Sequence, residues 1–192
     1  MFHVTISSPG SITYHAATMA AQSFYRNHPQ GEQMRIHIID SHTYTLAYGY
    51  PLMEAAAKIT RGATAQEIVA YLEDWFACVE IYFAPYTLKY VKKSGRVSCT
   101  AAFVGELVGL RPIISIIDGE ARMIEKVRGD KKIIPALLRH AKANRIPQTP
   151  YIIVQGQRKD VGEELRREAA KQLGGEAVGV FQAGAAITIN SG

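Results

Sequence analysis

The sequence predicts an α/β protein, with a partial parallel-sheet (Rossmann-like) first domain followed by an α+β second domain that contains a β-hairpin. Two observations predict it. Over the first 86 residues, short apolar runs alternate with helical patterns, which is typical of parallel strands joined by helical crossovers. Later, Asp118 and Gly119 separate two strand-like runs, which is the strongest short-range hairpin signal. We therefore expect domains at 1–86 and 87–192.

The elements of the first domain follow from periodic apolar residues that are bounded by turn residues. Pro51 suits the first turn of a helix. Thr64 and Glu67 have the spacing of a capping box, which predicts where the next helix begins. The expected strands, all in one parallel sheet, cover residues 2–6, 34–40 and 80–85. The expected helices cover residues 11–27, the second half of 44–60, and the segment from 64 through 76.

The elements of the second domain are arranged around the hairpin. Ser94 and Gly95 end a short helix that begins at Thr87. The expected strands are the hairpin partners 111–117 and 121–127, then 151–154 and a Gly- and Ala-rich run at 177–189. The expected helices cover residues 87–93, 98–109, 130–144 and 161–173.

The composition indicates a soluble protein. Twenty-two Lys and Arg residues against 17 Asp and Glu residues give a formal charge of +5, which permits an anionic partner without requiring one. No run approaches the ~18 apolar residues of a membrane span, and the N-terminus does not read as a signal peptide, so we expect a cytoplasmic location. Cys78 and Cys99 form neither a metal-binding spacing nor a disulfide framework, and we expect reduced thiols.

The strongest candidate site is the loop 7–13, which follows a strand and opens a helix. Free backbone N–H groups and the helix dipole favour an anion there, and the hydroxyls of Ser7, Ser8, Ser11 and Thr13 add donors. A carboxylate or a phosphate fits. The alternative is a plain helix cap, since Ser and Thr at a helix start need no ligand. The loop lacks a Gly-rich nucleotide fingerprint and a Walker lysine, which disfavours nucleotide binding.

Two basic segments are further candidates. Arg96 lies between a glycine and a predicted helix start and fits an anion with its guanidinium; the alternative is a solvated basic turn. A second segment fits an acidic partner; the alternative, a solvated charged face, is the simpler interpretation. Its cations are not interleaved with aromatic residues, so we expect no nucleic-acid partner. They are Arg122, Lys126, Arg128, Lys131, Lys132, Arg139, Lys142 and Arg145.

The sequence offers no obvious catalytic apparatus. The six histidines show no metal-binding spacing, and Ser8 does not lie in a nucleophile elbow. No pair of carboxylates is marked out for acid–base work. We therefore expect a binding protein rather than an enzyme, with no metal and no cofactor.

Four stretches, in this order along the chain, resemble the DegV family of bacterial fatty-acid-binding proteins. Residues 6–14 read Ile-Ser-Ser-Pro-Gly-Ser-Ile-Thr-Tyr, and residues 38–41 read Ile-Ile-Asp-Ser. Residues 87–98 read Thr-Leu-Lys-Tyr-Val-Lys-Lys-Ser-Gly-Arg-Val-Ser. Residues 110–114 read Leu-Arg-Pro-Ile-Ile, and the hairpin turn and Glu-Lys-Val-Arg at 125–128 follow. Each motif alone is modest, but their order across the chain is specific.

This resemblance implies a long-chain fatty acid in an apolar tunnel between or within two DegV-like domains. The carboxylate would be held by the serine loop and offered to a fatty acid kinase, while this chain performs no chemistry. By position, Ser8 matches the serine that contacts the carboxylate, with Ser7, Ser11 and Thr13 beside it. Arg96 matches the arginine near the head group, and Phe181 and Gln182 fall at the head-group end.

The sequence also departs from the family pattern. It starts after the first α/β stretch of the family, so the threonine that shares the carboxylate has no counterpart. We expect either an N-terminally shortened, diverged relative or a protein of which this sequence is only a part. Phe181 stands where relatives carry a histidine. An alternative is therefore a diverged, ligand-free paralog that acts as a protein-interaction module. The first sheet also lacks strands, which predicts an exposed edge through which a homo-oligomer could pair.

Overall fold

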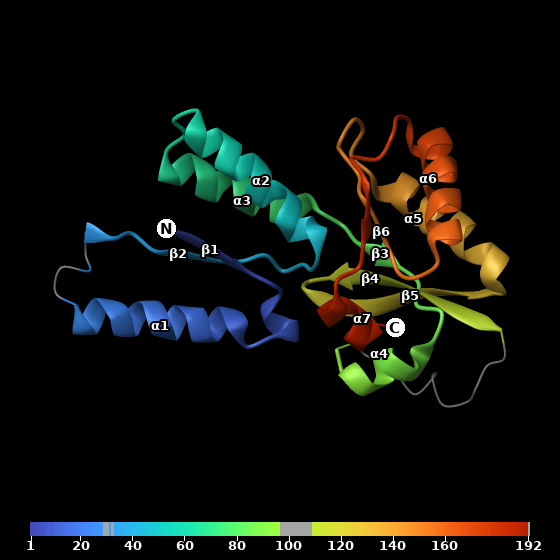
Figure 1. The fold of residues 1–192 in the computed structure, drawn as a ribbon, viewed down its shortest axis with the longest axis horizontal. Helices are drawn as coiled ribbons and strands as arrows, with labels where there is room; N and C mark the ends of the chain where they lie inside the picture. Colours follow the sequence, from blue (N-terminus) through green and yellow to red (C-terminus); the bar gives the residue numbers. More distant parts are fainter. Residues whose placement is uncertain (29–30, 32, 97–108, 192) are drawn as a thin grey trace. The chain divides into compact units, whose positions relative to one another are not determined.

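We describe the protein from a computed structural model that covers residues 1–28, 31, 33–96 and 109–191. The chain forms two compact units, each of which is described by itself (Figure 1). The first comprises Met1–Ile81 and the hairpin tip Ile117–Glu120, and the second comprises Tyr82–Ile116 and Ala121–Gly192. The assignment of residues 1–86 and 87–192 to two DegV domains stays a prediction.

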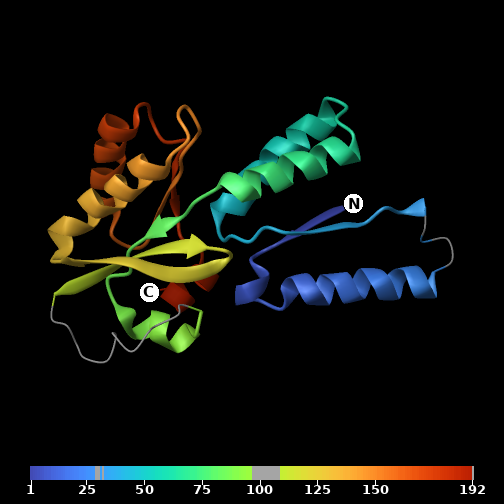
Figure 2. The same ribbon diagram turned by 180° about the vertical axis from the view of Figure 1, so that it is seen from behind.

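A two-stranded parallel sheet forms the centre of the first unit. Strand β1 (Phe2–Thr5) pairs with β2 (His37–Asp40), with Val4 opposite Ile39. Helix α1 (Thr13–Asn27) lies on one side of the strands, and α2 (Leu46–Thr60) and α3 (Ala65–Cys78) lie on the other (Figures 1 and 2). The alternating side chains of the strands explain this arrangement, since Phe2, Val4 and Ile39 face α2 and α3. They pack there with Ala55, Ile68 and Leu72.

Helix α2 corrects the predicted position of Pro51. The proline lies inside the helix rather than in its first turn. Because proline has no backbone N–H, the Ala47 carbonyl four residues earlier lacks its usual helical donor. The indole Nε1 of Trp75, on α3, donates to that oxygen at 2.9 Å. A side chain of the neighbouring helix thus makes the proline tolerable.

The start of α3 confirms the predicted capping box. The Thr64 Oγ1 accepts a hydrogen bond from the Glu67 N–H, and the Glu67 carboxylate accepts one from the Thr64 N–H. Helix α4 (Leu88–Ser94) is confirmed similarly. Thr87 caps it by accepting from the Lys89 N–H, and Gly95 ends it in the left-handed conformation.

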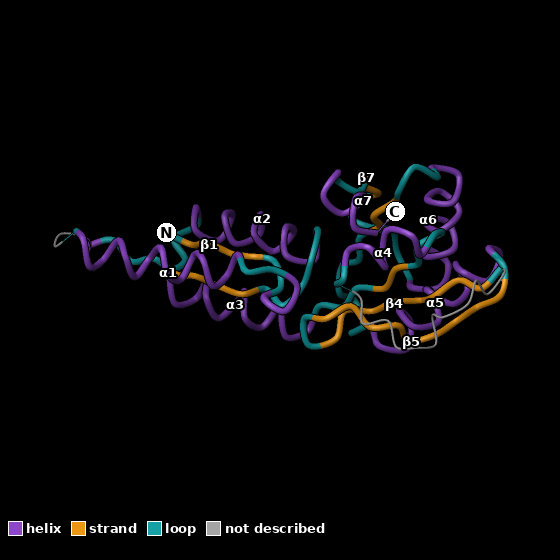
Figure 3. The backbone as a smooth tube through the Cα atoms, turned by 90° about the horizontal axis from the view of Figure 1, so that it is seen from below, coloured by secondary structure: helices purple, strands orange, loops and turns teal. Residues whose placement is uncertain are grey.

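The third predicted strand exists, but its predicted pairing in the parallel sheet is wrong. Strand β3 (Tyr82–Phe83) pairs antiparallel with β4 (Leu110–Ile117), and Tyr82 lies opposite Ser115. The sheet of the second unit has the order β3-β4-β5, where β5 is Glu120–Arg128. Figure 3 shows β4 and β5 side by side. Apolar periodicity predicts that a strand exists, but it does not specify a partner that lies thirty residues further on.

The hairpin of β4 and β5 is confirmed. Asp118 and Gly119 both have positive φ angles, 52° and 78°. Positive φ at both positions is typical of the type I′ turn, which matches the twist of the flanking strands and favours an Asp-Gly pair.

The rest of the second unit pairs helices with a short parallel sheet. A 3₁₀ turn at Asp130–Lys132 leads into α5 (Ile133–Asn144), and β6 (Ile153–Gln155) pairs in parallel with β7 (Val180–Gln182). Helix α6 (Lys159–Leu173) packs beside α5. The buried residues shared by these elements are Ile134, Leu138, Ile153 and Ala169.

A third prediction, for the C-terminal run, is also wrong. Residues 177–189 were expected to be strand-like, but only β7 is a strand, and α7 (Ala185–Ser191) is a helix. Alanines and isoleucines satisfy either period, so this segment is ambiguous in sequence. The predicted helix at 98–109 falls almost entirely outside the described residues. Across the described ranges, no helix has the length and apolar character needed to cross a bilayer.

Candidate functional site

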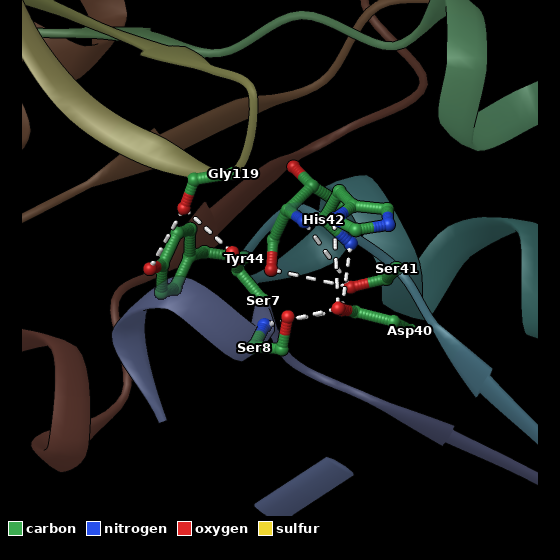
Figure 4. Close-up of polar contacts among 8 residues, drawn as sticks. Ser7, Ser8, Asp40, Ser41, His42, Tyr44 and Gly119 are labelled. Atoms are coloured by element: carbon green, nitrogen blue, oxygen red, sulfur yellow. Dashed lines mark hydrogen bonds and ion pairs between the residues drawn. The ribbon is translucent and has the colours of Figure 1, made fainter. Parts of the chain in front are cut away.

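The candidate site lies in the first unit, where two loops meet at the carboxyl ends of β1 and β2 (Figure 4). The Ser7 N–H donates to the Thr43 carbonyl at 3.0 Å and so joins the two loops. A 3₁₀ turn at Ser8–Gly10 then leads the chain towards α1. Ligands of open α/β sheets bind at the carboxyl ends of the strands, so this is where a binding site is expected.

Ser7 has a structural partner. Its side chain is fully buried, and its hydroxyl donates to the Gly119 carbonyl at 2.6 Å. The Tyr44 hydroxyl donates to the same oxygen at 3.3 Å. A methyl group on Gly119 would lie 2.5 Å from the Ser7 Oγ, so the close approach requires a glycine. The Ser7 hydroxyl proton is therefore used within the fold.

Ser8 is held by its backbone. Its N–H donates to both carboxylate oxygens of Asp40 at 3.2 Å, and the His42 N–H donates to one of them at 3.0 Å. The Asp40 side chain is only 8% exposed, and the His42 Nδ1 lies 3.5 Å from it. By contrast, the Ser8 hydroxyl makes no hydrogen bond within the described part of the chain. Ser8 thus combines a fixed backbone with an available hydroxyl.

Ser11 and Thr13 form the start of α1. Their hydroxyl oxygens lie 2.6 Å apart, and the Thr13 N–H donates to the Ser11 Oγ at 3.2 Å. This is a local side-chain-to-backbone turn ahead of the helix, whose N-cap is Ile12 and has no side-chain cap hydrogen bond. Gly10 packs tightly before them, because a Cβ there would lie 2.0 Å from the Tyr44 hydroxyl.

The remaining predicted site residues belong to the second unit. Arg96 is exposed just after α4, and its Nη1 donates to the Ser94 carbonyl at 2.7 Å. Phe181 and Gln182 are exposed on β7, where Phe181 pairs with Val154. The structure therefore brings Ser7, Ser8, Ser11 and Thr13 together in one unit and places these three in the other. That the four loop residues and Arg96 bind a carboxylate, with Phe181 and Gln182 at the head-group end, stays a prediction.

Three residues of the site were not predicted from the sequence. They are Asp40, Thr43 and Tyr44, of which only Asp40 belongs to a motif of the family resemblance. Their position in the sequence could have indicated them, because polar residues directly after one parallel strand lie close to those directly after its neighbour. The same loop contains His42 and Thr45 with positive φ angles of 50° and 56°, which are rare outside glycine.

The basic segment of the second unit is partly neutralised. Arg139 and His140 both contact the Glu125 carboxylate, and Arg111 pairs with Asp130 at 2.7 Å. Hydrogen bonds from His140 and then Arg139 lower the pKa of Glu125 below its usual value. Arg128, Lys131 and Lys132 are exposed and have no ion pair with any residue that the structure describes.

Within the described ranges, no three His, Cys, Asp or Glu side chains gather closely enough to hold an ion.

Comparison with protein families gives one match across the chain. A family model described as an uncharacterised protein of the DegV family matches residues 1–192. The curated fatty acid-binding protein of Thermotoga maritima is 31% identical over 137 residues, which are 70% of this chain and 45% of that protein. The chain spans about half the length of such curated relatives.

Solved structures share the fold. One described as fatty acid binding of a DegV family protein from Thermus thermophilus matches with a TM-score of 0.81 and 26% identity, over 100% of this chain and 66% of that one. The Fatty Acid Kinase (Fak) B3 protein of Streptococcus pneumoniae, loaded with linoleic acid, matches with a TM-score of 0.87 over 100% and 67%. At 18% identity, the second likeness concerns the fold alone. Together they confirm the predicted fold class.

Proposed function

The chain belongs to the DegV family, and on that premise we propose that it binds one long-chain fatty acid whose carboxylate is held at the loop 7–13. The observation that carries this proposal is the Ser8 hydroxyl, which is available while Asp40 holds the backbone beneath it. A 31% identical relative is named for fatty acid binding, which supports the same ligand class.

The head group requires donors that compensate for lost hydration. A carboxylate removed from water costs several kcal/mol unless it is paired or well hydrogen-bonded. In this proposal the Ser8 hydroxyl donates one bond, and its fixed backbone lowers the entropy cost of binding. Ser7 positions the loop through Gly119, and Ser11 and Thr13 shape its exit into α1.

The charge of Asp40 makes further compensation necessary. A second carboxylate close to this position disfavours an anionic ligand. We propose Arg96 as the positive charge for the head group, because it matches the arginine of the family motif. Phe181 and Gln182 complete the proposed head-group end, with an aromatic ring in place of the family histidine.

The acyl chain supplies most of the affinity. Burial of each methylene contributes roughly 0.8 kcal/mol, so a long chain in an apolar tunnel outweighs a sparse set of polar contacts. The proposal therefore predicts much weaker binding of short-chain acids and of short-chain alcohols than of long-chain acids. It assigns no bond-making or bond-breaking step to this chain.

A kinase partner is the second part of the proposal. A fatty acid kinase would transfer the γ-phosphoryl group of ATP to the carboxylate of the bound acid, which gives an acyl phosphate and ADP. The test mixes acid-loaded protein with such a kinase, ATP and hydroxylamine, which traps an acyl phosphate as a hydroxamate. Hydroxamate formation that depends on this chain supports presentation, whereas its absence with a kinase active on its own carrier contradicts it.

The binding test compares two serine substitutions. Ser8→Ala removes the proposed donor, and Ser23→Ala removes a hydroxyl that accepts a bond from Asn27 within α1. We expect Ser8→Ala to weaken oleate binding roughly tenfold or more in a fluorescence displacement assay, because a hydrogen bond to a charged group is lost. Ser23→Ala should bind like the wild type. Equal affinity of all three proteins contradicts the role of Ser8.

One observation favours a second function, that of a ligand-free interaction module. Arg128, Lys131 and Lys132 form an exposed basic surface without ion pairs in the described structure. Such a surface fits an acidic protein partner. Under this alternative the purified protein contains no lipid, and reversing Arg128 and Lys132 to Glu abolishes the complex with that partner.

A further inference from the structure

Thr43 buries a hydroxyl group that has no partner. The residue is 3% exposed, and its Oγ1 makes no hydrogen bond to any described residue. Its backbone is fully used, since the N–H donates to the Ser41 Oγ and the carbonyl accepts from the Ser7 N–H and the Ser41 hydroxyl. The deficit is therefore confined to the side-chain hydroxyl.

Such a group costs stability and needs an explanation. A buried donor without a partner carries its full desolvation penalty, whereas valine has the same shape and carries none. The backbone of the loop is also strained, because Thr45 is β-branched and adopts a φ of 56°. A buried hydroxyl without a partner and a strained backbone in one loop are typical of a ligand-binding segment.

The position of Thr43 connects it with the proposed head-group loop. Its carbonyl holds the N–H of Ser7, the residue directly before Ser8. Both residues lie beyond the carboxyl ends of the parallel strands β1 and β2. A carboxylate has two oxygens and accepts several hydrogen bonds, so one hydroxyl leaves it under-satisfied in a buried site.

We propose that the Thr43 hydroxyl donates the second hydrogen bond to the carboxylate of the fatty acid held by Ser8. This inference rests on the proposed function and assigns to it a donor that the sequence motifs did not. The ligand would supply the partner that the hydroxyl lacks, and the cost of the buried group in the free protein would be recovered on binding.

Thr5 provides a matched control. Its hydroxyl is equally buried and equally without a partner among the described residues. It differs in position, because Thr5 is the last residue of β1, opposite Asp40 in the β1–β2 ladder, whereas Thr43 lies in the loop after β2. Replacing either threonine by valine removes one orphaned hydroxyl and keeps the shape, so the two variants differ only in where that hydroxyl was.

The experiment measures melting temperature without lipid and oleate affinity for four proteins. We expect Thr43→Val to melt at or above the wild-type temperature and to bind oleate roughly tenfold or more weakly. Thr43→Ser, which keeps the hydroxyl, should retain most of the affinity. Thr5→Val should melt like Thr43→Val and bind like the wild type.

Three results overturn the inference. Wild-type affinity in Thr43→Val, alongside weakened binding in Ser8→Ala, leaves the proposed function standing and removes Thr43 from it. A clear fall in the melting temperature of lipid-free Thr43→Val shows a structural hydroxyl instead. Equal loss of affinity in Thr5→Val and Thr43→Val shows an effect that is not specific to the loop. If wild-type protein binds no fatty acid, the proposed function itself fails.

Discussion

The hydroxyl of Ser7 donates a hydrogen bond of 2.6 Å to the carbonyl of Gly119, a residue 112 positions later in the chain. Both groups are buried. The contact joins the loop that carries Ser8 to the turn of the hairpin, so two motifs that are distant in the sequence meet in one cluster. The Ser7 hydroxyl can approach this carbonyl closely because Gly119 has no side chain.

Ser7→Ala should destabilise the protein by about 0.5–1.5 kcal/mol, because one buried hydrogen bond is lost while the Tyr44 hydroxyl still donates to the Gly119 carbonyl. Urea unfolding followed by circular dichroism measures this. Ser23→Ala, at a half-buried position on α1, is the control and should change stability far less. A loss of equal size in the control would remove the special role of Ser7.

Gly119→Ala should lower the free energy of unfolding more than Gly62→Ala does, although both glycines have positive φ angles. Gly119 combines a φ of 78° with a Cβ position 2.5 Å from the Ser7 Oγ. Gly62 has a φ of 92° but open space around its Cβ, so Gly62→Ala pays only the conformational cost of roughly 1–2 kcal/mol. Thermal unfolding of both variants, and of Gly119→Ala with Ser7→Ala, isolates the clash. Matching losses at the two glycines would contradict it.

Trp75→Phe should cost about 1–3 kcal/mol, because the Ala47 carbonyl has no helical donor opposite Pro51. The dependence on proline is testable in a double-mutant cycle. In a Pro51→Ala background the helix regains an N–H for that carbonyl, so Trp75→Phe should cost less there. The same cost in both backgrounds would show that the indole contributes by packing alone.

The Glu125 contact should make stability depend on acid. Hydrogen bonds from His140 and Arg139 lower the pKa of Glu125 in the folded protein. A lowered pKa stabilises the fold above the ordinary glutamate value of 4.5, and that contribution is lost as the pH falls below it and through the folded pKa. The difference in unfolding free energy between wild type and Glu125→Gln should therefore shrink as the pH is lowered from about 6 to about 3.

Local signals predicted much of the fold and the serine loop of the site. The capping box of Thr64, the turn at Gly119 and the stop at Gly95 each depend on a few neighbouring residues, and all three are confirmed. Long-range relationships escaped prediction. The pairing of Tyr82 with Ser115 and the bond of Ser7 to Gly119 depend on which distant segments meet, and no local pattern encodes that.

The central claim is tested most directly by mass spectrometry of the purified protein, native and then denatured with organic extraction. The account predicts one long-chain fatty acid for each chain, lost in part from Ser8→Ala. Protein that is empty on purification, and whose melting temperature does not rise when palmitate or oleate is added, would contradict it and favour the interaction module.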